Sequence, residues 1–178
     1  MEWNIVLMGP VGAGKSRAIK SISDTDLVET VVQPKSSAVV HTSAGKVFMG
    51  RLQLASGDSL KLYSLPGLDQ FDFTWDVLLQ QAHGVVLLLN HVRSNALADL
   101  DHFAFAIRAR TGHAELPMAI GVTHSENAPG HSLRAYTDHV LARSIQACGV
   151  APPVFSLDTR HRGQVNGLLL ALLAQIEM

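Results

Sequence analysis

The residues with the clearest chemical meaning form one glycine-rich segment near the start of the chain. Residues 9–16 read Gly-Pro-Val-Gly-Ala-Gly-Lys-Ser and match the pattern G-x-x-x-x-G-K-[ST] at every fixed position. In this pattern the glycines let successive backbone N–H groups curl around phosphate groups, and Lys15 reaches the terminal phosphates. The hydroxyl of Ser16 would complete the inner shell of a Mg²⁺ ion that bridges two phosphates. The spacing therefore predicts a phosphate-binding loop.

The segment lies between a predicted strand and a predicted helix, as the pattern requires. Trp3 to Met8 is mostly apolar, which is typical of a strand buried on both faces of a parallel sheet. The stretch from Ser16 to Ser23 carries Ala18, Ile19 and Ile22 at helical spacing. This order of strand, loop and helix supports the interpretation of the motif.

Apolar runs and amphipathic segments alternate along the rest of the chain. Lys46 to Leu54 and Ser59 to Tyr63 alternate around Ser56-Gly57-Asp58, which predicts a hairpin and one antiparallel strand. The later pattern predicts strands at 84–90, 117–122 and 154–156, and helices around 75–82, 97–107, 133–145 and 165–176. We therefore expect a single α/β domain over residues 1–178, with three layers, six strands and about five helices.

Composition limits the possible partners and compartment. Fourteen Lys and Arg residues against fifteen Asp and Glu residues leave no broad basic field for nucleic acid or anionic lipid. The longest apolar stretch, Gly84 to Leu89, falls far short of the ~20 residues that span a bilayer. A single cysteine, Cys148, forms no internal disulfide, and the first residues lack the pattern of a signal peptide. We expect no membrane span, no nucleic-acid partner and a cytoplasmic location.

Beyond the loop, the hairpin, the segment from Leu65 to Asp76 and the run from Gly121 to Glu126 extend a likeness over almost the whole chain. The chain resembles the Ras-like small GTPases, most closely the bacterial MglA-type group of GTPases related to the signal-recognition-particle receptor β subunit. The resemblance implies a P-loop fold, GTP and GDP as ligands, Mg²⁺ as cofactor and GTP hydrolysis as the activity. It also implies an effector or activating protein of the Roadblock/LC7 type at the switch regions, and a role in signalling.

The chain departs from the family at the second switch, whose usual pattern is Asp-x-x-Gly-Gln. Ser64 stands in place of the aspartate and Leu68 in place of the glutamine that orients the attacking water. Gly67 is retained, so its amide would approach a γ-phosphate. Because leucine has no hydrogen-bonding group, we expect very slow intrinsic hydrolysis. The expected catalytic residues are Lys15 and Gly67, with Gln70 as the polar side chain most worth testing.

The resemblance also implies where the base and the metal lie. Thr123-His124-Ser125-Glu126 stands in place of Asn-Lys-x-Asp, and Glu126 keeps a carboxylate acceptor, so guanine is expected with weakened affinity. A second base loop would fall at Ser156 to Arg160 and act through backbone N–H groups. A loop serine, Ser37 or else Ser36, would join Ser16 on the metal. The expected nucleotide contacts are Gly9, Pro10, Val11, Gly12, Ala13, Gly14, Lys15, Ser16, Arg17, Thr123, His124, Glu126, Ser156, Leu157 and Asp158.

Five large apolar residues gather in the short segment after the hairpin. We interpret Phe71 and Trp75 as core residues that anchor a helix. Leu65, Leu68 and Phe73 are harder to bury together, so we expect them to form an exposed patch. Such a patch would bind a partner in a way that depends on the γ-phosphate.

Two other functions are consistent with the same loop. One is a pseudo-GTPase that holds its nucleotide permanently as a structural ligand. The other is a small-molecule kinase that uses Arg108 and Arg110, or Arg160 and Arg162, although no segment is evident for a substrate lobe or a lid. The nine histidines show no metal-binding spacing and carry no hypothesis of their own.

Overall fold

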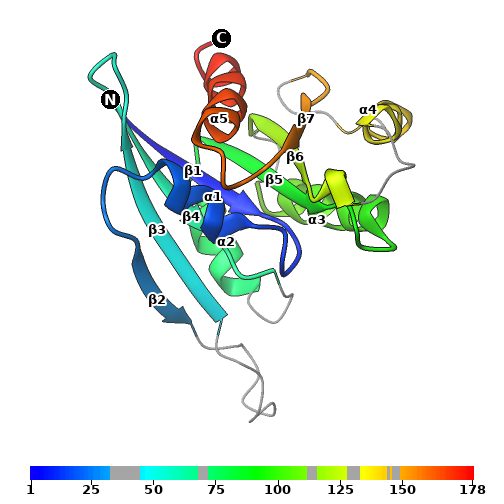
Figure 1. Cartoon of the computed structure of the whole chain (residues 1–178), viewed down its shortest axis with the longest axis horizontal. Coiled ribbons are helices and arrows are strands. Elements are labelled where there is room, and N and C mark those ends of the chain that lie inside the picture. Colours follow the sequence, from blue (N-terminus) through cyan, green and yellow to red (C-terminus); the bar gives the residue numbers. More distant parts are fainter. Residues whose placement is uncertain (33–44, 68–71, 112–115, 128–132, 144, 146–148) are drawn as a thin grey trace.

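A computed structural model describes residues 1–32, 45–67, 72–111, 116–127, 133–143, 145 and 149–178. Its centre is one sheet of seven strands in the order β2-β3-β4-β1-β5-β6-β7 (Figure 1). The strands are β1 (Glu2–Met8), β2 (Val28–Val32), β3 (Gly45–Gln53), β4 (Ser59–Ser64), β5 (Gly84–Asn90), β6 (Met118–Thr123) and β7 (Val154–Leu157). β3 pairs antiparallel with both of its neighbours, and every other pairing is parallel, so β3 is the single antiparallel strand that was expected.

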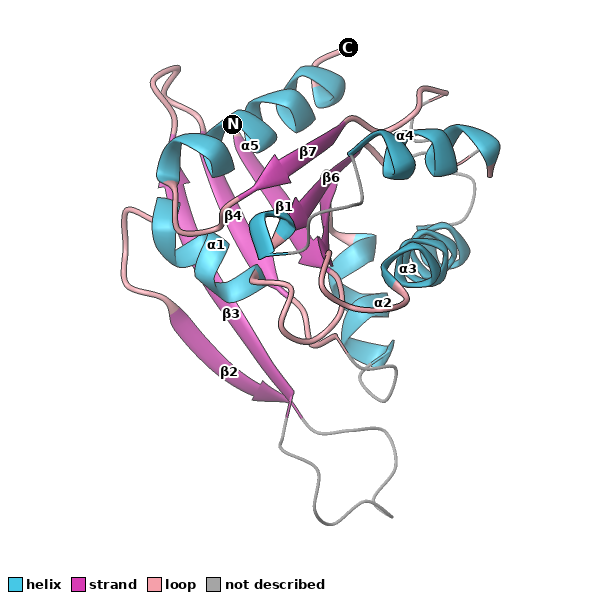
Figure 2. Ribbon diagram, turned by 45° about the vertical axis from the view of Figure 1, so that its right-hand side comes forward, coloured by secondary structure: helices cyan, strands magenta, loops and turns pink. Residues whose placement is uncertain are grey.

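Helices cover both faces of the sheet and make a three-layer molecule (Figure 2). Helices α1 (Lys15–Ile22) and α5 (Arg162–Ile176) pack against each other on one face. Helices α2 (Asp72–Gln80), α3 (Ala96–Thr111) and α4 (Leu133–Ala142) pack on the other face. A short 3₁₀ helix, η2 (Ser125–Asn127), follows β6. The part of the chain that the structure describes thus holds the five α-helices that were expected.

The central strands are apolar throughout because each of their faces meets a helical layer. In β1, Ile5 and Leu7 pack toward α1 and α5, whereas Val6 and Met8 pack toward α2 and α3. Successive residues of a strand point to opposite faces, so both sets must be apolar. In β5, which spans the range predicted from its sequence, every residue from Gly84 to Leu89 is buried.

The sheet has seven strands, so the expectation of six was wrong. The additional strand, β2, has the sequence Val-Glu-Thr-Val-Val, and no residue in it is fully buried. Among the described strands it lies at the edge of the sheet and pairs with β3 alone. A strand that buries neither face has no apolar periodicity to reveal it, and its pairing with β3 supplies its structure.

The parallel strands bring several loops to one edge of the sheet. The glycine-rich segment follows β1, residues 65–67 follow β4, η2 follows β6, and residues 158–161 follow β7. Because β1, β4, β5, β6 and β7 run in the same direction, their carboxyl ends meet at that edge. The fold therefore gathers segments that are about 150 residues apart in the chain, such as residues 9–16 and 158–161.

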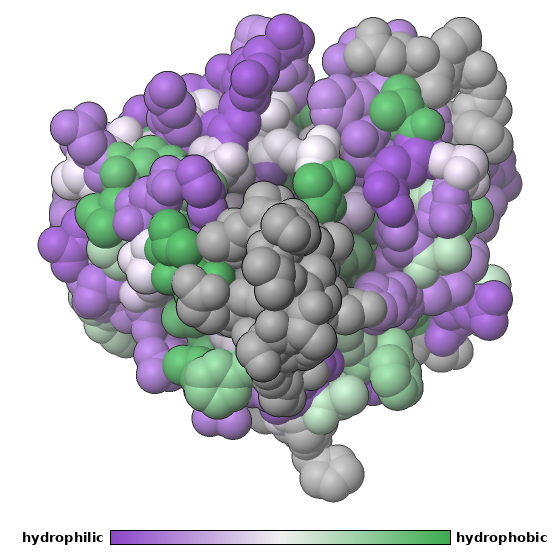
Figure 3. All heavy atoms as spheres, turned by 90° about the horizontal axis from the view of Figure 1, so that it is seen from below, coloured by the Kyte–Doolittle hydropathy of each residue, from purple (hydrophilic) through white to green (hydrophobic). Residues whose placement is uncertain are grey.

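On the face of the molecule seen from below, the described residues mix hydrophilic and hydrophobic side chains (Figure 3). Hydrophilic residues in purple and hydrophobic residues in green are interspersed in the view from below (Figure 3). Among the described residues, none of the helices has the length and apolar character that crossing a bilayer requires.

Candidate functional site

The loop after β1 takes a path that only glycine accommodates at several points. Gly9, Gly12 and Gly14 have φ angles of 142°, 81° and 94°, in the region that L side chains rarely adopt. A Cβ atom at Gly9 would lie 2.0 Å from the carbonyl oxygen of Leu88. Gly14 precedes α1 in a left-handed conformation, and a Cβ atom there would lie 2.9 Å from Oγ1 of Thr159. The glycines therefore set both the curvature of the loop and its contacts with neighbouring strands.

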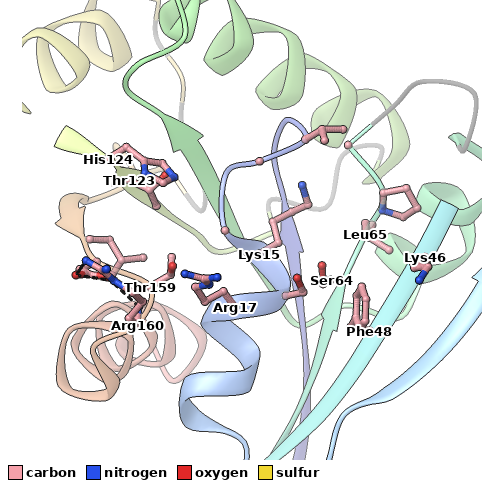
Figure 4. Close-up of a pocket in the computed structure, with 18 of the residues that line it drawn as sticks. Lys15, Arg17, Lys46, Phe48, Ser64, Leu65, Thr123, His124, Thr159 and Arg160 are labelled. Atoms are coloured by element: carbon pink, nitrogen blue, oxygen red, sulfur yellow. Dashed lines mark hydrogen bonds and ion pairs between the residues drawn. The ribbon is translucent and has the colours of Figure 1, made fainter. Parts of the chain in front are cut away.

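Lys15 extends from the first turn of α1 into the curve of this loop (Figure 4). Its Nζ donates hydrogen bonds to the carbonyl oxygens of Gly9 and Pro10, each at 2.8 Å. The side chain is 8% exposed, and its burial lowers the pKa of the ammonium from 10.5 to about 8. An ammonium has three N–H donors. The described residues accept from two of them, which leaves one for a ligand in the cavity.

Thr123, at the end of β6, fixes the far side of the loop. Its buried Oγ1 lies 2.9 Å from the carbonyl oxygen of Ala13 and 3.1 Å from that of Leu89. The hydroxyl has one proton, so these two carbonyl oxygens share it. The expected base contact at Thr123 thus has its hydroxyl directed at the glycine-rich loop.

A cavity of about 760 Å³ opens beside the loop at the carboxyl edge of the sheet (Figure 4). Volumes of this size are typical of small-molecule sites. Its walls come from the glycine-rich loop, the first turn of α1, β3, the end of β4 and the loops after β6 and β7. The lining residues are Val11, Gly12, Gly14, Lys15, Ser16, Arg17, Gly45, Lys46, Phe48, Ser64, Leu65, Pro66, Gly67, Thr123, His124, Glu126, Leu157, Asp158, Thr159 and Arg160.

The loops after β6 and β7 are joined to each other at the end of the cavity away from Lys15. The hydroxyl oxygens of Ser125 and Ser156 lie 2.8 Å apart. His124, next to Ser125, has a φ angle of 58°, an uncommon left-handed conformation for a residue other than glycine. Glu126 is exposed in η2. The negative charge of its carboxylate helps to raise the pKa of Arg160 on the second loop, after the larger effect of Asp158. These contacts make the two loops one wall of the cavity.

A salt bridge organises the loop after β7. The guanidinium of Arg160 holds Asp158 with Nη2 at 2.8 Å from Oδ2 and Nε at 2.9 Å from Oδ1, and the backbone N–H of Arg160 also donates to Oδ1. These donors lower the pKa of Asp158 well below its usual range. The backbone N–H of Asp158 donates to Oε1 of Gln164 at 2.7 Å, so this amide already has an acceptor.

The segment after β4 lies directly against the glycine-rich loop. A Cβ atom at Gly67 would be 2.6 Å from both the carbonyl oxygen of Gly9 and the nitrogen of Val11. The neighbouring Pro66 accepts a hydrogen bond from Nε1 of Trp75 at 2.9 Å. Gly67, expected at the catalytic centre, is thus brought against the loop, and Trp75 on α2 holds the residue before it.

The expectation of an exposed apolar patch in this segment was wrong for Leu65. Its side chain is 1% exposed and belongs to the core between the sheet and α2. The residue follows β4, and its backbone N–H donates to the carbonyl oxygen of Leu7, which keeps the chain within the sheet at this point. Phe73 is 63% exposed and Trp75 is 1% exposed, so both of these expectations are confirmed.

The structure brings twelve of the expected site residues to the cavity wall. Three others, Gly9, Pro10 and Ala13, are buried residues of the loop itself and present their carbonyl oxygens to Lys15 and Thr123. Ser156 lies outside the wall but bonds to Ser125. Ser36, Ser37, Leu68, Gln70 and Phe71 fall outside the described residues, so the second metal ligand and the third catalytic candidate stay predictions.

Sequence reasoning missed several lining residues. Lys46 and Phe48 share one face of β3 because they are two positions apart, a relation that the alternating pattern already contained. The sheet order, however, decides that this face borders the glycine-rich loop. Thr159 was missed for the same reason, because its buried side chain packs against Gly14, which is 145 residues earlier in the chain. No local sequence pattern indicates that β3 borders the loop or that Thr159 contacts Gly14.

The oxygen-bearing side chains that line the described part of the cavity limit how a metal ion would be held. Among the lining residues, the hydroxyls of Ser16 and Ser64 come from the start of α1 and the end of β4, whereas the carboxylates of Glu126 and Asp158 are on the loops after β6 and β7. Over the described ranges, no group of three His, Cys, Asp or Glu side chains is arranged to hold a metal. The donor set suits one hydroxyl ligand for a Mg²⁺ ion whose other ligands are phosphate oxygens and water.

No protein-family model and no curated protein sequence matches this chain.

Proposed function

We propose that the chain binds a guanine nucleotide and acts as a Ras-like, MglA-type switch between GTP and GDP, with slow or partner-assisted hydrolysis. The observation that carries the proposal is the buried ammonium of Lys15, held 2.8 Å from the carbonyl oxygens of Gly9 and Pro10 at the wall of a cavity. A buried cation with a lowered pKa gains stability when an anion enters beside it. A polyphosphate is the anion that the spacing of Lys15 and Ser16 suits.

The shape of the cavity supports a nucleotide rather than a free phosphate. The glycine-rich loop and Lys15 form one end, and the joined loops after β6 and β7 form the other. At about 760 Å³, the cavity has room for a sugar and a base beyond the phosphates. Glu126 offers a carboxylate acceptor that suits the N1–H and N2–H₂ donors of guanine, so guanine is the proposed base.

The strand order supports a P-loop fold of the Ras-like kind. β1 is central, the glycine-rich loop follows it, and the ligand site lies at the carboxyl ends of parallel strands. Helix α1 begins at Lys15, so its positive end faces the place proposed for the phosphates. Ser16 would hold a Mg²⁺ ion, which would neutralise phosphate charge.

The polar groups near Lys15 favour slow hydrolysis. Of the described residues that line this end, none is a glutamine, glutamate or aspartate that would orient an attacking water. The side chain after Ser64 is the buried Leu65, and Gly67 contributes only backbone. Positioning by Lys15 and backbone amides remains, and the missing group would come from a partner or from Gln70, which lies outside the described residues. The same observation supports the second candidate, a pseudo-GTPase in which the nucleotide is a permanent structural ligand.

The test is a titration of the purified full chain, stripped of nucleotide, with GDP, GTP, ADP and ATP in Mg²⁺ and in EDTA. We expect binding of GDP and GTP, weaker binding of the adenine nucleotides, and loss of binding in Lys15→Ala. Lys20→Ala is the matched control, since Lys20 is an exposed residue of the same helix. A folded chain that takes up none of the four nucleotides would refute the proposal.

Single-turnover hydrolysis of GTP separates the switch from the scaffold. Cleavage that a partner protein accelerates supports the switch. A nucleotide that stays intact and bound through repeated buffer exchange supports the structural role.

A further inference from the structure

Arg17 differs from the other cationic side chains of the cavity. Each of the other three donates to a described partner: Lys15 to Gly9 and Pro10, Lys46 to Glu29, and Arg160 to Asp158. Among the described residues, none lies within hydrogen-bond or ion-pair distance of the Arg17 guanidinium. The cavity thus contains one exposed cation whose donors are available to a ligand.

The position of Arg17 in its helix has a cost that an anion would remove. The residue lies in the first turn of α1, which holds no acidic side chain. A cation at the positive end of a helix is destabilising. A negatively charged ligand beside the guanidinium reverses this effect.

The place of Arg17 in the cavity indicates which part of a nucleotide it meets. Figure 4 shows its guanidinium between Lys15 and the loop of Thr159 and Arg160. Under the proposed function, on which this inference rests, Lys15 contacts the terminal phosphates and the Thr159 loop lies toward the base. The sugar-linked phosphate and the sugar lie between these two parts of a nucleotide. Of the two, only the phosphate carries the negative charge that a guanidinium binds.

We propose that the side chain of Arg17 binds the sugar-linked phosphate of the nucleotide and thereby adds affinity that is independent of the base. A guanidinium is planar, and its parallel N–H donors match two oxygens of a phosphate group. Lysine lacks this fork, so it replaces the charge but not the paired hydrogen bonds.

The first test measures the Kd of GDP and of ADP for the full chain and for Arg17→Met, Arg17→Lys and Lys20→Met. We expect Arg17→Met to weaken both nucleotides by a similar factor of about tenfold or more, and Arg17→Lys to recover part of the loss. Lys20→Met, on the same helix, should leave both constants unchanged. Because Arg17 is exposed, the empty Arg17→Met protein should melt at or above the wild-type temperature, which separates lost binding from lost folding.

The second test replaces one non-bridging oxygen of the sugar-linked phosphate by sulfur, using both diastereomers of GDPαS. Sulfur is a poor acceptor for a guanidinium, and the fork would engage both non-bridging oxygens. Each diastereomer should therefore bind the wild type more weakly than GDP does, and both ratios should shrink in Arg17→Met. An Arg17→Met protein that binds GDP as Lys20→Met does, or that keeps the full sulfur effect, would overturn the inference and leave the proposed function standing. A wild-type chain that binds neither GDP nor ADP would refute both.

Discussion

The hydroxyl oxygen of Thr123 lies 2.9 Å from the carbonyl oxygen of Ala13, across 110 residues of sequence. This hydrogen bond ties the end of β6 to the glycine-rich loop and also brings in the carbonyl oxygen of Leu89 on β5. Three segments that line or support one cavity are thereby held at a single buried point. The loop that we propose for phosphates is thus fixed from outside as well as by its own glycines.

Replacing Thr123 by valine should therefore loosen the loop. Valine has nearly the same shape but no donor, so the carbonyl oxygen of Ala13 would be left buried without its partner. We expect a loss of about 1–3 kcal/mol in the free energy of unfolding and weaker GDP binding, measured by urea denaturation and calorimetry. Thr137→Val is the control, because that hydroxyl bonds to Leu133 on the exposed face of α4 and should have little effect. Equal effects of the two variants would show that the Thr123 bond does not hold the loop.

The burial of Lys15 should make stability rise with pH. Its pKa is about 8 in the folded chain and 10.5 when unperturbed, so between these values the unfolded chain binds more protons than the folded chain. The free energy of unfolding should therefore increase from pH 8 to 10.5, by an amount of about 3 kcal/mol from this group alone. Below pH 8 the group gives no slope. Denaturation curves of wild type and Lys15→Met at several pH values isolate the contribution of Lys15 to the free energy of unfolding. A difference in this free energy that stays constant across the range would contradict the prediction.

The same lysine should couple nucleotide binding to protons with the opposite sign. A bound phosphate favours the charged ammonium and raises its pKa above the value of about 8 in the empty cavity. Binding above pH 8 then takes up a proton, so the Kd of GDP should increase by up to about tenfold per pH unit, while below pH 8 this group adds no dependence. Calorimetry in two buffers with different ionisation enthalpies counts the protons. Net proton release above pH 8 would argue against a phosphate beside Lys15.

A methyl group at Gly67 should push the segment after β4 off the loop. The added Cβ atom would lie 2.6 Å from the carbonyl oxygen of Gly9 and from the nitrogen of Val11, and both are backbone atoms that cannot rotate away. We expect Gly67→Ala to lose about 1–3 kcal/mol of stability and to change the relative affinities for GTP and GDP. Gly167→Ala is the matched control, since its Cβ atom would meet nothing within 4 Å inside α5 and should stabilise the helix by up to about 1 kcal/mol. A Gly67→Ala protein as stable as wild type would show that the segment is not seated on the loop.

Local patterns predicted most of the elements because their burial leaves a periodic trace in the sequence. The continuous apolar run of β5 and the spacing of Ala18, Ile19 and Ile22 in α1 both correspond to buried faces. The strand β2 was not predicted because both of its faces are largely exposed, so its sequence has no apolar periodicity. The burial of Leu65 was predicted wrongly for a related reason. A residue that follows a strand can point into the core or toward solvent, and the adjacent residues in the sequence do not indicate which of the two occurs.

By itself, the sequence determined the loop from Gly9 to Ser16. Its glycines, its lysine and the flanking strand and helix are local features whose conformation follows from steric limits within a few residues. Only the tertiary structure decided what surrounds this loop, namely the contacts of Thr123 with Ala13, of Thr159 with Gly14 and of Gly67 with Val11. Those contacts depend on the order of strands in the sheet, which is set by the packing of the whole core and leaves no mark on the short segments that it brings together.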